Sequence, residues 1–270
     1  MKKIRAGIVG CGTIGREIGK AIFSSIKDIE LISVSEANEE NLNTFNRFLN
    51  MEFKSVTIPE LISLVDIVIE SASSEISYEV AFKTLSSSKN VMIMSVGGLM
   101  EGFPKLYELA QKNGVKLYIP SGAISGLDGL KAASCSKIYS VELTTTKPPK
   151  GLLGAPHLVK NNININNITE KTCVFEGNAQ EAVNAFPKNI NVALTLSLAG
   201  IGRERTKIKI IADPECKTNI HEIQAKGSFG SFYIRNENEP APGNPKTSYL
   251  AILSAVSMLK NMTNPVQIGS

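Results

Sequence analysis

The first 120 residues alternate between short apolar runs and stretches with helical periodicity, and this alternation restricts the fold more than any other feature of the sequence. The apolar runs are residues 4–9, 29–34, 66–69, 90–94 and 115–119, with a weaker run at 53–57. The helical patterns between them are residues 14–23, 40–49, 59–64, 78–85 and 104–112. Short, nearly all-apolar runs are typical of strands that are covered on both faces. The pattern therefore predicts an α/β domain, a doubly wound parallel sheet of the Rossmann type with crossover helices on both faces.

The pattern changes after Gly122. Helical spacing is found at residues 126–134, 179–186 and 192–198, and strand-like patterns at 138–146, 207–212, 219–226 and 228–235. The last three alternate between apolar and polar residues, as strands with one wet face do. We therefore predict a smaller α+β domain with an open mixed sheet. The expected boundaries are 1–122 for the first domain and 123–244 for the second, with 245–270 packing back on the first.

A glycine-rich hexapeptide, Gly10-Cys11-Gly12-Thr13-Ile14-Gly15, follows the first apolar run and opens the first helical stretch. In this context Gly10 permits a tight turn, Gly12 lets the backbone approach a pyrophosphate, and Gly15 allows the helix to pack closely on the strand. The start of the helix adds free N–H groups and the positive end of the helix dipole. We therefore predict a dinucleotide-binding loop in which Gly10, Gly12, Thr13, Ile14 and Gly15 contact the cofactor.

Glu36 predicts which dinucleotide is bound. It follows Gly15 by 21 residues, at the end of the second apolar run, where a carboxylate can accept hydrogen bonds from an adenosine ribose. The 2′-phosphate of NADP would meet Glu36, Glu39 and Glu40 there, so we expect NAD. NADP stays open, because a Lys or Arg from elsewhere in the chain could reach the phosphate.

Composition excludes several other classes of protein. The chain of 270 residues has 29 basic and 25 acidic residues, a net charge of +4 that does not provide a dense basic surface for nucleic acid. No apolar stretch approaches the roughly 20 residues of a membrane-spanning helix. The four cysteines show no C-x-x-C spacing, which favours a reducing cytoplasm and no metal site. Cys135 could be a nucleophile, but its apolar surroundings predict a buried structural thiol.

His221 is the candidate for proton transfer. A period of two places it on the same strand face as Ile223 and Ala225, which should be the buried face. A buried histidine can be a hydrogen-bonded core residue or a general acid or base, and the residues alone leave both readings open. The other histidine, His157, lies in a loop rich in Gly and Pro and is the poorer candidate.

Two further segments could contact ligands. Asn189 and Asn191 stand at the expected start of a helix, where one could cap the helix and the other could offer its amide to a ligand. The loop from Ser121 to Asp128 leaves the last strand of the parallel sheet, at the edge where ligands of such sheets bind.

The sequence resembles the L-aspartate dehydrogenase family over nearly its whole length. The segments that carry the resemblance are the glycine loop, Met94-Ser95-Val96-Gly97-Gly98, Pro120-Ser121-Gly122-Ala123-Ile124-Ser125-Gly126-Leu127-Asp128, Thr146-Lys147-Pro148-Pro149, Phe186-Pro187-Lys188-Asn189-Ile190-Asn191-Val192-Ala193, Asn219-Ile220-His221-Glu222-Ile223 and Asn244-Pro245-Lys246-Thr247-Ser248. One departure is Glu36-Ala37, where the family often has Asp followed by Arg.

The resemblance implies cofactor contacts at Ala123 and Asn189 and makes His221 the active-site histidine. It implies reversible oxidative deamination of L-aspartate to iminoaspartate, then oxaloacetate and ammonia, with a link to pyridine-nucleotide synthesis. Asn191 and Lys188 are our candidates for substrate binding, and we expect a homodimer. The alternatives are a related two-domain reductase of another imine or semialdehyde, and a non-catalytic NAD(H) sensor.

Overall fold

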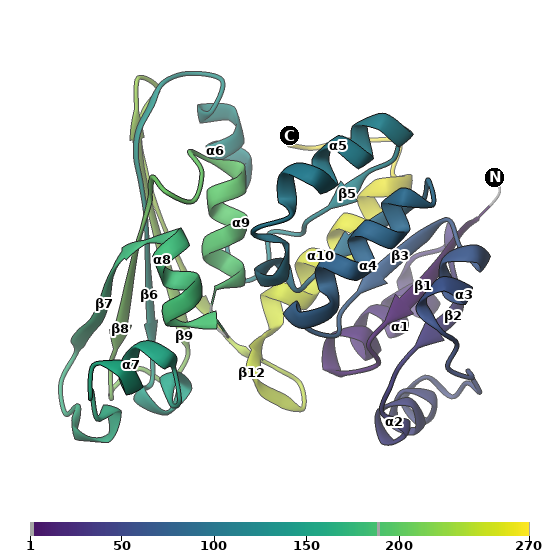
Figure 1. The fold of residues 1–270 in the computed structure, drawn as a ribbon, viewed down its shortest axis with the longest axis horizontal. Coiled ribbons are helices and arrows are strands. Elements are labelled where there is room, and N and C mark those ends of the chain that lie inside the picture. Colours follow the sequence, from purple (N-terminus) through teal and green to yellow (C-terminus); the bar gives the residue numbers. More distant parts are fainter. Residues whose placement is uncertain (1–2, 188–189, 270) are drawn as a thin grey trace. The chain divides into compact units, whose positions relative to one another are not determined.

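The computed structural model of the protein describes residues 3–187 and 190–269 (Figure 1). The chain divides into two compact units. The first comprises Met1–Pro120 and Ala255–Pro265, and the second comprises Ser121–Ser254 and Val266–Ser270.

The first unit is built on a five-stranded sheet in the order β2-β1-β3-β4-β5. The strands are β1 (Ile4–Val9), β2 (Ile29–Ser35), β3 (Ile67–Glu70), β4 (Asn90–Ile93) and β5 (Leu117–Tyr118). Every neighbouring pair is parallel, so the predicted parallel sheet is confirmed. Val9 pairs with both Ser35 and Glu70. The loops that follow β1, β2 and β3 therefore start at the same edge of the sheet.

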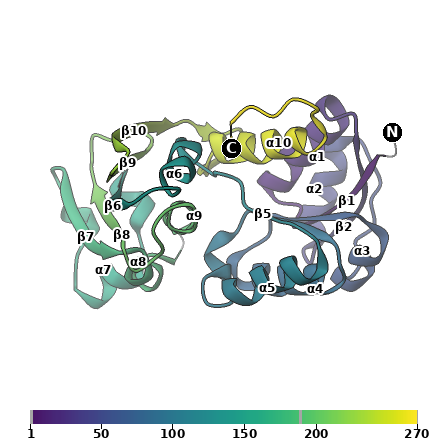
Figure 2. The same cartoon turned by 90° about the horizontal axis from the view of Figure 1, so that it is seen from above.

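Helices cover both faces of this sheet (Figure 2). They are α1 (Thr13–Ser25), α2 (Glu39–Leu49), α3 (Ile58–Leu64), α4 (Ser74–Ser86), the 3₁₀ turn η1 (Val96–Leu99) and α5 (Phe103–Asn113). One core joins Ile8 of the sheet to Ile18 of α1 and Phe45 of α2. Ala255 and Leu259, from the last helix α10 (Tyr249–Thr263), belong to the same core. A second core packs α3, α4 and α5 against the opposite face.

The second unit contains a five-stranded sheet in the order β10-β9-β6-β8-β7. Its strands are β6 (Ile138–Lys147), β7 (Thr172–Asn178), β8 (Thr206–Ala212), β9 (Asn219–Gly227) and β10 (Gly230–Asn238). β6 and β8 are parallel and the other neighbours are antiparallel, which confirms the predicted mixed sheet. The remaining elements are α6 (Leu127–Ala133), η2 (Pro149–Leu152), α7 (Pro156–Lys160), η3 (Ile165–Asn167), α8 (Ala179–Ala185), α9 (Asn191–Ala199), β11 (Pro240–Ala241) and β12 (Asn244–Ser248).

The two faces of this second sheet differ in polarity. The inner face is apolar over most of its length, where Leu143 of β6 lies opposite Ile223 of β9 and both are buried. The outer face carries charged residues, and the ion pair between Lys209 and Glu142 spans β8 and β6 at 3.2 Å. Alternation along the strands therefore produces the one wet face that the sequence predicted.

The structure differs from the sequence-based expectations at three places. Residues 53–57 form no strand, and only an isolated bridge joins Val34 to Ser55, because the side chain of Asn46 takes both the N–H and the C=O of Phe53. β7 was not predicted, since its pairing with β8 is interrupted by an irregularity between Cys173 and Phe175 that disturbs the alternation. Cys135 is exposed and not buried, because α6 ends before it.

Candidate functional site

The glycine-rich loop lies at the edge of the parallel sheet where β1 ends. Gly10 has a φ of +94°, and a Cβ at Gly10 would lie 2.6 Å from backbone atoms of Ala72. A Cβ on Gly15 would lie 2.1 Å from the carbonyl oxygen of Gly10, so α1 can approach β1 only with glycine there. Gly12 instead faces open space, with nothing within 4 Å of the position of a Cβ.

The start of α1 is suited to an anion. No side chain caps the helix at Gly12, and its first turn, which begins with Thr13 and Ile14, holds no acidic residue. The N–H groups at a helix start and the positive end of the helix dipole favour a phosphate. Together with the open side of Gly12, these residues fit the diphosphate of a dinucleotide.

Glu36 lies directly beside this loop. Its Oε2 accepts a hydrogen bond from the backbone N–H of Cys11 at 2.7 Å, and its Oε1 accepts one from Asn38 at 2.9 Å. The carboxylate is therefore held at the end of β2, next to the turn that β1 makes into α1. Cys11 itself is buried, and burial, reinforced by the charge of Glu36, raises the pKa of its thiol to about 12. The thiol stays protonated and unreactive at neutral pH.

Glu70, at the end of β3, is a buried carboxylate that the sequence analysis did not single out. It accepts hydrogen bonds from Ala72 N at 2.8 Å, from Ser95 N at 3.0 Å and from Ser95 Oγ at 2.9 Å. Burial raises its pKa, and these hydrogen bonds oppose the rise. Ser71 donates to the carbonyl oxygen of Gly10 at 2.8 Å, so the loops after β3 and β4 are tied to the glycine loop. The feature of the sequence that could have identified Glu70 is an acidic residue at the end of an otherwise apolar run.

His221 lies on the inner face of the second sheet, as its spacing predicted. It is 4% exposed, and its neighbours along the strand, Ile223 and Ala225, are buried on the same face. Its Nδ1 is hydrogen-bonded to Thr145 Oγ1 of β6 at 3.0 Å. Burial, with a smaller contribution from the charge of Lys147, lowers the pKa of His221 to about 3. The ring is therefore neutral at neutral pH.

Lys147, the last residue of β6, is the cation that acts on His221, and the sequence analysis did not identify it. Thr145 lies directly opposite His221 in the antiparallel pair of β6 and β9. Lys147 is two residues beyond Thr145 and so belongs to the same face. Burial lowers the pKa of its ammonium group to about 8. A lysine that ends a strand directly before Pro148 and Pro149 was the signal in the sequence.

The loop that contains Ala123 is fixed to β10 by two asparagines. Asn238 donates its amide to the carbonyl oxygen of Ala123 at 3.1 Å. Asn236 accepts a hydrogen bond from Ser125 N at 3.2 Å, and it lies opposite His221 in the pair of β10 and β9. The buried Oδ1 of Asn238 has no hydrogen-bond partner among the described residues. The loop therefore lies at the polar end of the face that carries His221.

The other site candidates from the sequence analysis are Lys188, Asn189, Asn191 and His157. Lys188 and Asn189 lie outside the described residues, so the structure says nothing of their predicted contacts. Asn191 is the exposed first residue of α9 and does not cap it, because the N-cap position is Ile190. His157 packs in an aromatic cluster, with its ring centre 5.2 Å from that of Phe175.

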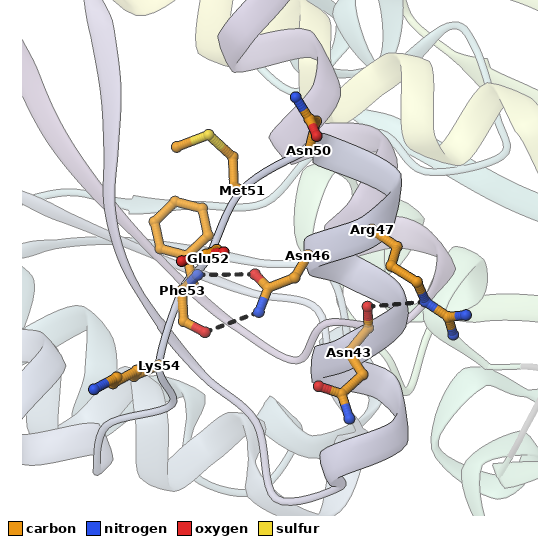
Figure 3. Close-up of a pocket in the computed structure, with 8 residues that line it drawn as sticks. All are labelled: Asn43, Asn46, Arg47, Asn50, Met51, Glu52, Phe53 and Lys54. Carbon is orange, nitrogen blue, oxygen red and sulfur yellow. Dashed lines mark hydrogen bonds between the residues drawn. The ribbon is translucent and has the colours of Figure 1, made fainter.

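A separate pocket lies in the first unit between α2 and the segment that follows it (Figure 3). Asn43, Asn46 and Arg47 line it from the helix, and Phe53 and Lys54 line it from the segment. It contains none of the predicted site residues. Within residues 3–187 and 190–269, no group of three or more His, Cys, Asp or Glu side chains could hold a metal ion. No helix in those ranges is both long and apolar enough to cross a membrane.

Comparisons with known proteins match both parts of the chain. A family model described as "Homoserine dehydrogenase, NAD binding domain" matches residues 10–120, and one described as "Aspartate dehydrogenase, C-terminal" matches residues 128–262. These matches indicate a nicotinamide nucleotide as the cofactor class of the first unit.

Full-length relatives agree with the family models. The chain is 48% identical over 270 residues to a protein of Methanococcoides burtonii named L-aspartate dehydrogenase, covering 99% of this chain and 100% of that protein. A protein of Methanococcus maripaludis with the same name is 42% identical over 271 residues, with coverage of 99% and 100%. The crystal structure of aspartate dehydrogenase from Thermotoga maritima superposes with a TM-score of 0.75 at 26% identity, covering 98% of this chain and 99% of that one. The resemblance found in the sequence is thus confirmed. The chain belongs to the L-aspartate dehydrogenase family, whose members are oxidoreductases.

Proposed function

We propose that this protein catalyses the reversible, NAD-dependent oxidative deamination of L-aspartate. The products are iminoaspartate, which hydrolyses to oxaloacetate and ammonia, and NADH. The observation that carries the proposal is His221, a buried and neutral imidazole held by Thr145 beside a lysine. The full-length relatives named L-aspartate dehydrogenase support the same reaction.

The reaction requires the loss of a hydride from Cα and of protons from the amino group. Bound NAD would supply the hydride acceptor, its nicotinamide ring. Neutral His221 takes a proton from the substrate amino group, or from the water that adds to the imine, and returns one in the reverse direction. The hydrogen bond between Thr145 and Nδ1 fixes the ring, so that Nε2 is the nitrogen offered to the substrate.

Residues of the first unit would hold the cofactor. Gly10, Gly12 and Gly15 shape the loop for the diphosphate, and Thr13 and Ile14 supply the N–H groups at the start of α1. Glu36 would bind the adenosine ribose through its carboxylate, which favours NAD over NADP. Ala123 and Asn189 are proposed as further cofactor contacts, and Asn191 and Lys188 as substrate contacts.

A substrate panel tests this function. Reduction of NAD and of NADP should be followed with L-aspartate, D-aspartate, L-glutamate and L-alanine, beside a direct titration with NADH. We expect L-aspartate with NAD to give the highest kcat/KM. Turnover of another substrate in place of L-aspartate would indicate a different reductase, and NADH binding without any turnover would indicate a sensor.

Two wider expectations accompany the proposal. Iminoaspartate is a reactive precursor that pyridine-nucleotide synthesis can consume, and a coupled assay that traps it before hydrolysis would detect that use. The proposed homodimer would be measured by light scattering.

A further inference from the structure

Lys147 lies at a polar end of a sheet face that is apolar along β6. β6 runs along this face through the buried residues Val141 and Leu143 and then reaches Thr145 and Lys147. Across the strand pair, Thr145 meets His221. Beyond Thr145, Lys147 pairs with buried Ala212 of β8 on the other side. The ammonium group thus belongs to the same cluster as the imidazole.

The backbone and the aliphatic stem of Lys147 are both held in place. Its carbonyl oxygen accepts a hydrogen bond from Asp213 N at 2.9 Å, which extends the pairing of β6 and β8 by one residue. The chain then turns through Pro148 and Pro149 into η2. Gly151 of that turn lies over the lysine, because a Cβ at Gly151 would be in van der Waals contact with Cβ and Cδ of Lys147 at 3.8 Å. These contacts restrict the aliphatic stem of the lysine.

The positive charge of Lys147 is unfavourable in this position, and it also disfavours the protonated form of the His221 ring. Burial makes the charged form of Lys147 costly, which is why its pKa falls to about 8. The same charge contributes to the low pKa of His221, so it opposes the uptake of a proton by the imidazole. An anion bound beside both residues would reverse both effects, since it stabilises the ammonium group and the protonated ring together. The charges of this cluster therefore fit a bound carboxylate.

We propose that the ammonium group of Lys147 binds a carboxylate of the substrate beside His221. The inference rests on the proposed function, in which the substrate is an amino dicarboxylate. Lys147 then touches the substrate and is part of the binding machinery, and its contribution is to orient the carbon skeleton while His221 exchanges the proton. A charged hydrogen bond of this kind supports binding more than the neutral contacts around it.

The test compares K147M, K147R and the control K207M by steady-state kinetics. Lys207 lies on β8 with its side chain exposed on the outer face, so K207M removes a lysine charge from the same sheet away from the cluster. We expect K147M to raise KM for L-aspartate roughly 10- to 100-fold, the usual effect of losing a hydrogen bond to a charged group. K147R should recover part of this loss because it keeps the charge, and K207M should match the wild type.

A binding measurement that needs no turnover completes the test. Succinate, a four-carbon dicarboxylate without an amino group, is titrated into the NADH-loaded protein. We expect K147M to bind succinate more weakly by a similar factor, with NADH affinity and Tm unchanged. If K147M does not fold, K147Q takes its place.

The two hypotheses fail in different ways. A wild type that does not oxidise L-aspartate overturns the proposed function. A wild type that does so, together with a K147M variant whose KM and succinate affinity are normal, overturns the role of Lys147. A shift of the pH profile in K147M without a change in KM overturns it as well, because Lys147 would then act only through the charge it places near His221.

Discussion

The hydroxyl group of Thr145 lies 3.0 Å from Nδ1 of His221, across the pair of strands β6 and β9. This contact restrains the ring at the end of the sheet face where Asn236 and Lys147 also lie. Because Nδ1 is engaged in this contact, Nε2 is the ring nitrogen that we propose to face the substrate. The hydrogen bond therefore orients the imidazole that we propose as the proton-transfer group.

The first prediction is that Thr145→Val lowers kcat roughly 3- to 10-fold, because valine keeps the shape of threonine and removes one neutral hydrogen bond. Thr144→Val is the matched control, since Thr144 is the preceding residue on the opposite face of the sheet. Both variants should fold and bind NADH. A Thr145→Val enzyme with the kcat of the control would show that the hydroxyl does not position the ring.

The second prediction concerns His221→Ala. Loss of a general acid or base should lower kcat by about 10²- to 10⁴-fold while NADH binding stays close to that of the wild type. A histidine with only a packing role would instead leave a cavity and an unpaired Thr145, and would lower Tm. Measuring Tm beside kcat separates these two roles. A folded variant with near-normal kcat would exclude His221 from the mechanism.

The third prediction is a pH dependence of stability that comes from His221. The folded protein keeps this ring neutral down to a pKa of about 3, whereas the unfolded chain binds the proton near the ordinary pKa of 6.5. Between these values the unfolded state holds more protons, so the free energy of unfolding rises with pH through this window.

Urea unfolding of the wild type and of His221→Gln at several pH values measures this effect. We expect the wild type to show the steeper pH dependence, by at most about 1.4 kcal/mol per pH unit, which is the limit for one proton. Equal slopes for the two proteins would contradict the burial of a neutral His221.

The fourth prediction is that Glu36→Ala weakens NAD binding and reduces the preference for NAD over NADP. The substitution removes the hydrogen bonds of one carboxylate and its repulsion of a 2′-phosphate, which we expect to cost roughly 1 to 3 kcal/mol of NAD binding. Because Cys11 N loses its acceptor, Tm should also fall slightly. Glu108→Gln on α5 is the control. An unchanged ratio of kcat/KM for NAD and NADP would show that Glu36 does not contact the ribose.

The fifth prediction concerns Glu70→Gln. The carboxylate of Glu70 now accepts hydrogen bonds from the N–H groups of Ala72 and Ser95. Glutamine has the same side-chain volume, but its NH₂ group would face one of these two N–H donors. A buried donor without an acceptor costs about 1 to 3 kcal/mol, so Tm should fall. NADH affinity should fall too, because the glycine loop is tied to the loop after β3. Glu79→Gln, on the exposed side of α4, should change neither quantity.

The sequence by itself determined the order of strands and helices in the first unit, because apolar runs and helical periodicity are local properties of the chain. The glycine loop could also be predicted from the sequence, since Gly10 and Gly15 meet backbone requirements that are typical of the motif. The period of two along β9 also placed His221 on the buried face. The family resemblance then gave this histidine a role that burial alone left open.

Only the tertiary structure brought Lys147, Thr145 and His221 together. His221 lies 76 residues from Thr145 in the chain, and their contact exists because β6 and β9 pair in one particular register. A shift of one residue would have turned Lys147 to the outer face. This register depends on pairing between segments that are distant in the chain. The environment that lowers the pKa of both Lys147 and His221 depends on the same pairing. Local patterns in the sequence do not specify such pairing, so the cluster became visible only in the folded protein.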